Sequence, residues 1–133
     1  MASVIFPFRK EKSAIFGKIF RPVAKVFFWS KKWRRWEEIW MIVDSGADYT
    51  ILPGYLSAQL GVDLTTDCQK HKTGGIGGEE YVYLFRNQKV KLGRWQGIIP
   101  CGFLARDDIS PLLGRQDFLE RFKVTFEKHQ TIF

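Results

Sequence analysis

The chain has 133 residues, of which 45% are hydrophobic and 16% aromatic, and its formal net charge is +7. A chain of this length and composition is expected to fold as one domain around a packed core, which excludes a disordered protein. Two cysteines, Cys68 and Cys101, are too few for a disulfide framework and lack the spacing of metal ligands. No apolar run reaches the roughly 18 residues that a membrane-spanning helix needs. We therefore expect a soluble, cytoplasmic protein with free thiols and without a cofactor or metal.

The positive charge is concentrated in the N-terminal quarter. Residues 1–36 contain ten Lys and Arg side chains and one acid, Glu11, whereas residues 37–133 contain 11 basic and 13 acidic side chains. A basic patch with interleaved tryptophans can contact nucleic acid, an acidic partner or an anionic membrane surface. The same pattern is also typical of a solvated hairpin face that binds nothing.

In chain order, the first predicted elements are β-strands. Val4–Phe8 is a short apolar segment followed by a basic loop, and Ile15–Phe28 has the character of one strand. Pro22 within it indicates an edge position or a bulge, because proline cannot donate to a β-ladder.

The tryptophans at positions 29, 33, 36 and 40 are spaced as on one face of a helix. A helix there would run directly into the apolar run that ends at Val43, so we favour a β-hairpin. Its tip would carry four basic residues, Lys31, Lys32, Arg34 and Arg35. Further along, Pro53–Gly61 predicts a short helical turn that ends at Gly61. Strands are expected at Leu64–Thr73, Tyr81–Leu84, Lys89–Leu92 and Ile98–Leu104.

The most informative stretch is Trp40–Pro53. Its first four residues are apolar and largely β-branched or aromatic, as in a strand that is buried on both faces. The strand leads into Asp44 and is broken at Gly46, so the Asp44 carboxylate lies where a buried strand meets a turn. A buried carboxylate needs hydrogen-bond donors or a second group that shares its proton, and Ser45 offers a hydroxyl. Alternatively, Asp44 caps a helix that begins near Ala47, or lies in an ordinary turn.

Two later stretches carry further signals. Thr73–Glu80 has four glycines around the single Ile76, and it lacks the Lys-Ser/Thr of a phosphate-binding loop. We expect a hairpin tip here, either a mobile lid over a ligand or an ordinary loose turn. Pro111–Phe122 begins with an apolar pair before Gly114, and its last aromatic and aliphatic residues recur at helical spacing.

The three motifs together resemble one protein family. They are Asp-Ser-Gly-Ala-Asp at 44–48, Gly-Gly-Ile-Gly-Gly at 74–78 and Leu-Leu-Gly-Arg at 112–115. In this order they resemble the retropepsins, the single-domain aspartic proteases of retroviruses and their cellular relatives. The resemblance spans Phe20–Phe133 and implies a mostly β fold, a closed retropepsin-like barrel with one short C-terminal helix and a β-hairpin flap. Residues 1–133 would form a single domain, with a basic aromatic segment at 1–36 and a protease core at 37–133.

The resemblance also implies roles for individual residues. Asp44 matches the catalytic aspartate, and Ser45 matches a Thr or Ser whose hydroxyl helps lock two active-site loops together. Asp48 and Arg115 match an acid and an arginine that pair beside the catalytic loop, and we expect this pair to be partly buried and bidentate. Gly46 belongs to the same loop. Substrate-binding positions would be Ala47, the flap-tip residues Gly75, Ile76 and Gly77, and the apolar pocket walls Ile42, Ile51 and Leu112. Tyr49 is a departure, because some family members carry another acid there.

Peptide hydrolysis of this kind needs two carboxylates that share one proton. The chain has one Asp-Ser-Gly, it is too short for two lobes, and Asp48 is expected to face Arg115. The second Asp44 would then come from another copy of the chain, on the two-fold axis of a homodimer. The sequence therefore predicts an aspartic endopeptidase that acts on peptide or protein substrates without a metal.

Two alternatives remain at this stage. One is a catalytically silent retropepsin-like module that dimerises or binds peptides. The other is a nucleic-acid-binding domain that uses the basic, Trp-rich hairpin.

Overall fold

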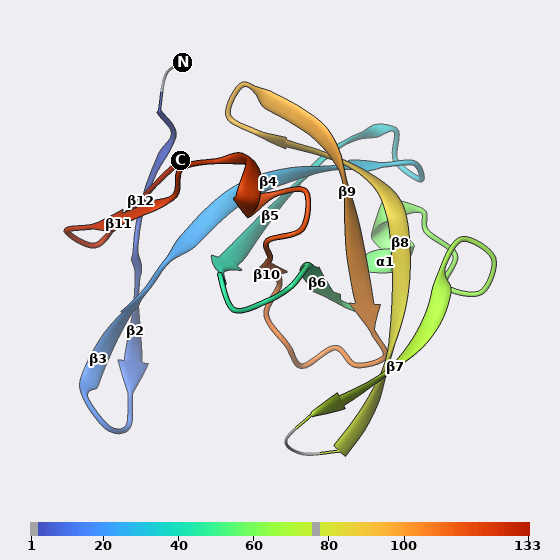
Figure 1. The fold of residues 1–133 in the computed structure, drawn as a ribbon, viewed down its shortest axis with the longest axis horizontal. Coiled ribbons are helices and arrows are strands. Elements are labelled where there is room, and N and C mark those ends of the chain that lie inside the picture. Colours follow the sequence, from blue (N-terminus) through green and yellow to red (C-terminus); the bar gives the residue numbers. More distant parts are fainter. Residues whose placement is uncertain (1–2, 76–77) are drawn as a thin grey trace.

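The computed structural model describes residues 3–75 and 78–133, and most of these lie in β-strands (Figure 1). Six strands close a barrel because the last one pairs back onto the first. In spatial order they are β4 (Val23–Ser30), β5 (Arg35–Val43), β10 (Leu112–Leu113), β6 (Thr50–Pro53), β9 (Trp95–Leu104) and β8 (Gly78–Leu92). A seventh strand, β7 (Gln69–Gly75), pairs with the first half of β8. The expected closed, mostly β barrel is thereby confirmed.

The hydrophobic core lies inside this barrel. Along β4 burial alternates, so that Val26 and Phe28 are fully buried while Phe27 between them is only half-buried. This alternation follows from the two-residue period of a strand. Phe103 of β9 and Leu52 of β6 face the same core and are also fully buried.

The Trp-rich segment forms the expected hairpin, β4–β5, and not a helix. Its turn comprises residues 31–34, and Trp29 lies opposite Trp36 across the two strands. The two indole rings meet edge to face, with their centroids 5.5 Å apart. Cross-strand pairing therefore determines the structure of this segment, although its tryptophans are spaced as on a helix.

Helical structure is short. The helix α1 (Leu56–Leu60) ends at Gly61, whose φ of +73° is left-handed, as expected. The expected C-terminal helix is a single 3₁₀ turn, η1 (Leu119–Arg121). Asp117 before it has a φ of +57° and Phe122 after it is extended, so the backbone leaves room for one turn only.

The prediction of one strand over Ile15–Phe28 was wrong. Two strands occupy this region, β3 (Gly17–Arg21) and β4, and they belong to different sheets on either side of Pro22. The basic loop expected after Phe8 is also a strand, β2 (Arg9–Ser13), which pairs with β3 as a separate hairpin. In the region expected as Leu64–Thr73, strand structure begins only at residue 69.

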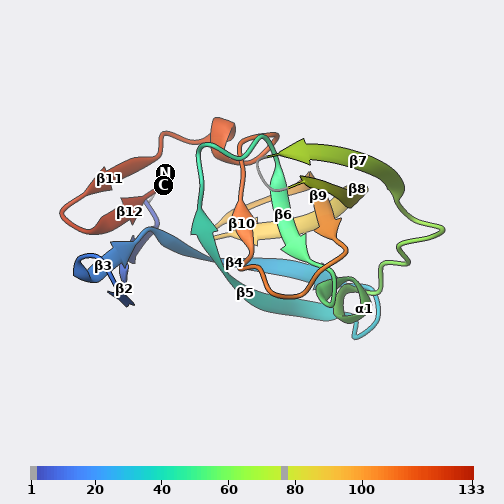
Figure 2. The same ribbon diagram turned by 90° about the horizontal axis from the view of Figure 1, so that it is seen from below.

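The two ends of the described chain meet in a small sheet outside the barrel. Its order is β1 (Ile5–Pro7), β12 (Gln130–Ile132) and β11 (Thr125–Glu127). Figures 1 and 2 show this sheet and the β2–β3 hairpin at the end of the molecule opposite α1. Among the described residues, no helix has the length and apolar character to cross a membrane. Both cysteines are free, as expected, and burial raises the pKa of Cys68 to about 11.

Candidate active site

Asp44 lies at the end of β5, where the chain turns away from the core into a loop that reaches β6. Its side chain is half-buried, and no helix begins at Ala47, so Asp44 is not a helix cap. The Gly46 amide donates to Asp44 Oδ1 at 2.9 Å, and the Ala47 amide donates to the Asp44 carbonyl at 3.1 Å. A Cβ atom at Gly46 would lie 3.2 Å from Asp44 Oδ1, tighter than most side-chain contacts. Glycine therefore lets the backbone approach and orient this carboxylate.

The two-residue strand β10 holds both sides of this loop. It pairs with β5 in parallel and with β6 in the antiparallel sense, and Leu112 lies opposite both Ile42 and Ile51. The Asp44 amide donates to the Leu113 carbonyl at 3.0 Å, and the Ile42 amide donates to the Pro111 carbonyl at 2.9 Å. The backbone at Asp44 is thus fixed by a segment from the other end of the sequence.

The three expected pocket residues lie in one row. Ile42, Leu112 and Ile51 face the same side of three neighbouring strands, and all three are half-buried. The residues that follow each of them, Val43, Leu113 and Leu52, point into the core instead and are buried. The barrel therefore presents a small apolar surface next to the strand end that carries Asp44.

Arg115 contacts Asp48 as expected, but the geometry differs from the expectation. One guanidinium nitrogen, Nη2, binds Asp48 Oδ1, and the two side chains are 50% and 81% exposed. The pair is therefore neither bidentate nor partly buried, because this loop faces solvent in the single chain. Backbone bonds join the same two segments, from the Arg115 amide to the Ala47 carbonyl at 3.0 Å and from the Gln116 amide to the Asp48 carbonyl at 2.8 Å.

Thr50 and Gly114 form a contact that sequence reasoning did not identify. The buried Thr50 Oγ1 accepts a hydrogen bond from the Gly114 amide at 3.2 Å. A Cβ atom at Gly114 would lie 2.2 Å from the Tyr49 carbonyl carbon, so only glycine fits there. The glycine of the Leu-Leu-Gly-Arg motif was visible in the sequence, whereas nothing marked Thr50 as its partner.

Tyr49, the departure from the family pattern, packs against glycines. A Cβ atom at Gly102 would lie 2.8 Å from Tyr49 Cε2, so the ring covers the β9 backbone at this point. Burial raises the pKa of the Tyr49 phenol, and the nearby Asp48 carboxylate raises it further. The ring is therefore neutral, and it packs against the β9 backbone.

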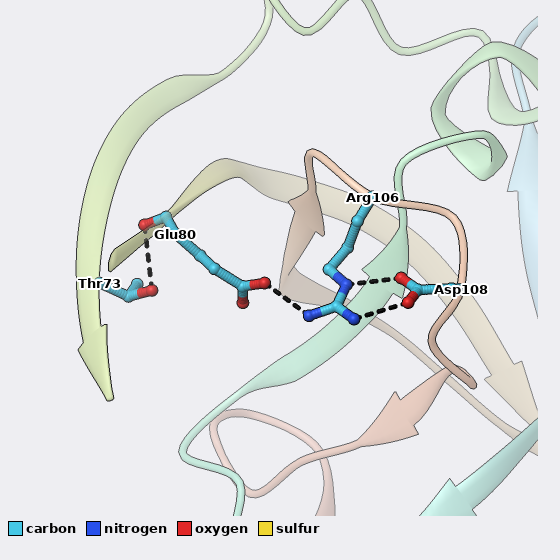
Figure 3. Close-up of polar contacts among 4 residues, drawn as sticks. All are labelled: Thr73, Glu80, Arg106 and Asp108. Carbon is cyan, nitrogen blue, oxygen red and sulfur yellow. Dashed lines mark hydrogen bonds and ion pairs between the residues drawn. The ribbon is translucent and has the colours of Figure 1, made fainter. Parts of the chain in front are cut away.

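The expected flap is a hairpin of β7 and β8. The ladder between them runs as far as Gly75 opposite Gly78, and the Thr73 hydroxyl donates to the Glu80 carbonyl at 3.1 Å (Figure 3). The expected tip residues Ile76 and Gly77 lie outside the described residues. The structure thus describes the two strands that lead to the tip.

Arg106 ties β8 near the tip end of this hairpin, at Glu80, to the loop between β9 and β10, a link that sequence reasoning missed. Its Nη1 binds Glu80 at 2.7 Å, while Nε and Nη2 bind the two carboxylate oxygens of Asp108 at 2.5 and 2.6 Å (Figure 3). The hydrogen bonds to Arg106 lower the pKa of Asp108, and those to Asp108 and Glu80 raise the pKa of Arg106. An Arg-Asp-Asp run in a loop has no periodicity that would have predicted this network.

An apolar cavity of about 370 Å³ lies beside the active-site loop. Ser45 and Arg115 line it on the loop side, and side chains of the C-terminal segment, including Phe122 and Phe126, line it on the other. Phe126 is exposed in the single chain. Within the described ranges, no group of three or more His, Cys, Asp and Glu side chains could hold a metal ion.

Comparisons with known proteins agree with this architecture. The family model described as Aspartyl protease matches residues 37–116, which is more than half of the chain. The fold is similar to a retropepsin-like aspartic protease from Rickettsia conorii, with a TM-score of 0.70 and 21% identity over all of this chain and 99% of that one. A search of curated proteins gave no match. The fold and motifs define the retropepsin-like class, and the chain belongs to the aspartyl protease family.

The close contact at Gly114 leads to the first testable prediction. Gly114→Ala would push a methyl group into the backbone at Tyr49, and we expect it to lower the free energy of unfolding by about 1–3 kcal/mol. Denaturant unfolding followed by tryptophan fluorescence measures this change. A loss below about 1 kcal/mol would show that the loop can yield at this point.

The neighbouring Arg115 provides a matched comparison. Because its ion pair with Asp48 is exposed, Arg115→Ala should lower the free energy of unfolding by less than about 1 kcal/mol. The same denaturant experiment applies. A loss as large as that of Gly114→Ala would mean that the ion pair, and not the backbone contact, holds the loop.

The Arg106 network predicts a local effect on the hairpin. Arg106→Gln should speed amide hydrogen exchange in β7 and at the start of β8, while Arg94→Gln, at an exposed position in another turn, should not.

The same network predicts a dependence of stability on pH. The pKa of Asp108 is lowered in the folded protein, so the stabilisation that Asp108 contributes is complete above its unfolded pKa of about 3.8. That contribution is lost as the pH falls through the folded pKa, so acid unfolding should also change in Arg106→Gln. Equal exchange rates in the two variants would contradict this role.

Proposed function

We propose that this protein is an aspartic endopeptidase that cleaves peptide bonds as a homodimer. The observation that carries the proposal is Asp44, a half-buried carboxylate oriented by the Gly46 amide at the end of a barrel strand. A barrel that served only for binding would not need a carboxylate held in this orientation by a backbone amide at a strand end.

The chemistry requires the Asp44 carboxylates of two protomers to share one proton. The ionised carboxylate takes a proton from a water molecule, which attacks the carbonyl carbon of the scissile peptide. The protonated carboxyl donates to the carbonyl oxygen, and a tetrahedral intermediate forms. Transfer of a proton to the amide nitrogen then allows the C–N bond to break. The Gly46 amide keeps each carboxylate in place, and the Ser45 hydroxyl links the two loops.

Several features support a second copy as the source of the other carboxylate. The chain contains one Asp-Ser-Gly, and Asp48 of the same loop is engaged by Arg115. Next to the loop, the cavity that includes Phe126 is apolar and open to solvent. A symmetric contact across this region would cover that surface and bring the two Asp44 residues onto the two-fold axis.

The substrate is proposed to be an extended peptide with apolar side chains near the cleaved bond. The row formed by Ile42, Leu112 and Ile51 supports this specificity, because it offers an apolar surface beside the carboxylate. Following the family resemblance, Gly75, Ile76 and Gly77 would close over the bound peptide, and Ala47 would border it.

Asp44→Asn tests the catalytic role. The variant keeps the size of the side chain but cannot act as a base, so cleavage of a peptide library should fall by at least about 100-fold with little change in melting temperature. Asp63→Asn is a matched control: its Oδ1 accepts hydrogen bonds from the Thr65 and Thr66 amides, which an asparagine oxygen can also accept. Cleavage by Asp44→Asn at the wild-type rate would refute the assignment.

Mixing the two proteins tests the homodimer. An excess of Asp44→Asn chains should lower the rate of a fixed amount of wild-type chain, because mixed dimers hold one intact carboxylate only. An unchanged rate would exclude a site shared between copies. A stable wild-type dimer that cleaves no peptide in the library would instead identify a silent dimerisation module.

A further inference from the structure

The β2–β3 hairpin, residues 9–21, is a distinct feature of this chain, and we refer to it as the arm. It projects away from the barrel in both views (Figures 1 and 2). At its root, the Phe20 ring stacks on the imidazole of His129 in the turn between β11 and β12, with centroids 4.1 Å apart and planes 13° apart. The arm is thus anchored at its base and free at its tip.

The tip of the arm is apolar. Ile15 and Phe16 are 84% and 76% exposed, more than any other large hydrophobic residue among those the structure describes. Gly17 closes the turn with a φ of +76°. The Ser13 Oγ accepts hydrogen bonds from the amides of Ile15 and Phe16, at 3.2 and 3.1 Å. Because these backbone donors are already satisfied, moving the tip into an apolar layer costs less than it would for a bare turn.

The two faces of the arm differ in charge. On one face Glu11 lies between Arg9 and Arg21, and it binds them at 2.8 and 2.7 Å. These hydrogen bonds hold the pKa of Glu11 below its usual value, so its carboxylate stays ionised and offsets one of the two arginine charges on this face. The register places Lys10, Lys12 and Lys18 on the opposite face. Within residues 3–75 and 78–133, no ion pair involves these three lysines.

We propose that the arm docks on the surface of a membrane that contains anionic phospholipids. Ile15 and Phe16 insert between the lipid headgroups, and Lys10, Lys12 and Lys18 bind the phosphates above them. A bilayer offers both an apolar layer and negative charge, which match the tip and the lysine face. A nucleic acid offers the charge but no apolar layer for Ile15, and a second copy of the chain would bring a second positive arm. This interaction is independent of the proposed peptidase activity.

Vesicle sedimentation with the full chain tests the proposal. We expect binding to vesicles of phosphatidylcholine mixed with phosphatidylglycerol, weaker binding at high salt, and little binding to phosphatidylcholine alone. The double variant Ile15→Ser, Phe16→Ser should lose at least about 100-fold in affinity. The triple variant Lys10→Gln, Lys12→Gln, Lys18→Gln should lose roughly fivefold for each lysine.

Matched control variants distinguish binding through the arm from non-specific hydrophobic or electrostatic binding to vesicles. Ile98→Ser removes an exposed apolar residue elsewhere on the barrel, and Arg86→Gln, Arg94→Gln, Lys123→Gln removes three exposed charges outside the arm. Both controls should bind the mixed vesicles more tightly than the matching arm variant. All variants change exposed side chains, so their melting temperatures should equal that of the wild type.

Four results would overturn the proposal. The first is no binding to the mixed vesicles, and the second is an equal loss of vesicle affinity in the arm variants and their controls. The third is binding to a single-stranded oligonucleotide but not to vesicles. The fourth is a shift from dimer to monomer when the Ile15→Ser, Phe16→Ser variant is studied by sedimentation velocity. The last result would identify a second copy as the occupant of the tip.

Discussion

The hydrogen bonds of the two-residue strand β10 are the constraint on which the candidate site depends. They join the end of β5 to the start of β6, so that the Asp44 backbone is fixed from outside its own loop. Gly114 and the buried Thr50 hydroxyl complete this junction, where a Cβ atom at Gly114 would lie 2.2 Å from the Tyr49 carbonyl carbon. The charged pair of Arg115 and Asp48 lies on top of an already rigid backbone and adds little free energy in solvent. Backbone pairing, and not charge, therefore orders the loop.

In the proposed hydrolysis, this loop would supply one of the two carboxylates that the reaction requires. One carboxylate would activate water and a second would polarise the carbonyl, and the chain contains one Asp-Ser-Gly. The apolar cavity beside Ser45 and the exposed Phe126 give the single chain a surface that a symmetric partner would cover. Arg106 ties Glu80, near the tip end of the β7–β8 hairpin, to the loop that leads into β10, so the hairpin and the carboxylate loop are both linked to the segment around β10. A peptide could then be held between two elements that share one support.

The barrel was predicted from the resemblance of three motifs to a known family. The Trp-rich hairpin was predicted because a helix would have run into the strand that ends at Val43, and the Asp44 loop because an apolar run breaks at Gly46. Sequence reasoning failed at residues 9–28, where Pro22 separates two strands in different sheets and charged residues form a strand through pairing alone. Such a strand has no apolar face, so periodicity cannot reveal it. The links Thr50–Gly114 and Glu80–Arg106 were missed since both depend on tertiary register. The Arg115–Asp48 pair was expected, but its exposure depends on what surrounds the loop.

The long-range pairing at β10 also has a consequence for folding kinetics. Gly114 and Thr50 are 64 positions apart in the chain, and Arg115 and Asp48 are 67 positions apart. Contacts of such high separation form late, because the entropy of closing a long loop must be lost before they contribute. A chain emerging from the ribosome therefore has an unsupported Asp44 loop until residues beyond 113 have been made. If the chain is the proposed peptidase, synthesis past Gln116 and barrel closure would precede assembly of the site, so the nascent chain would be inactive until then.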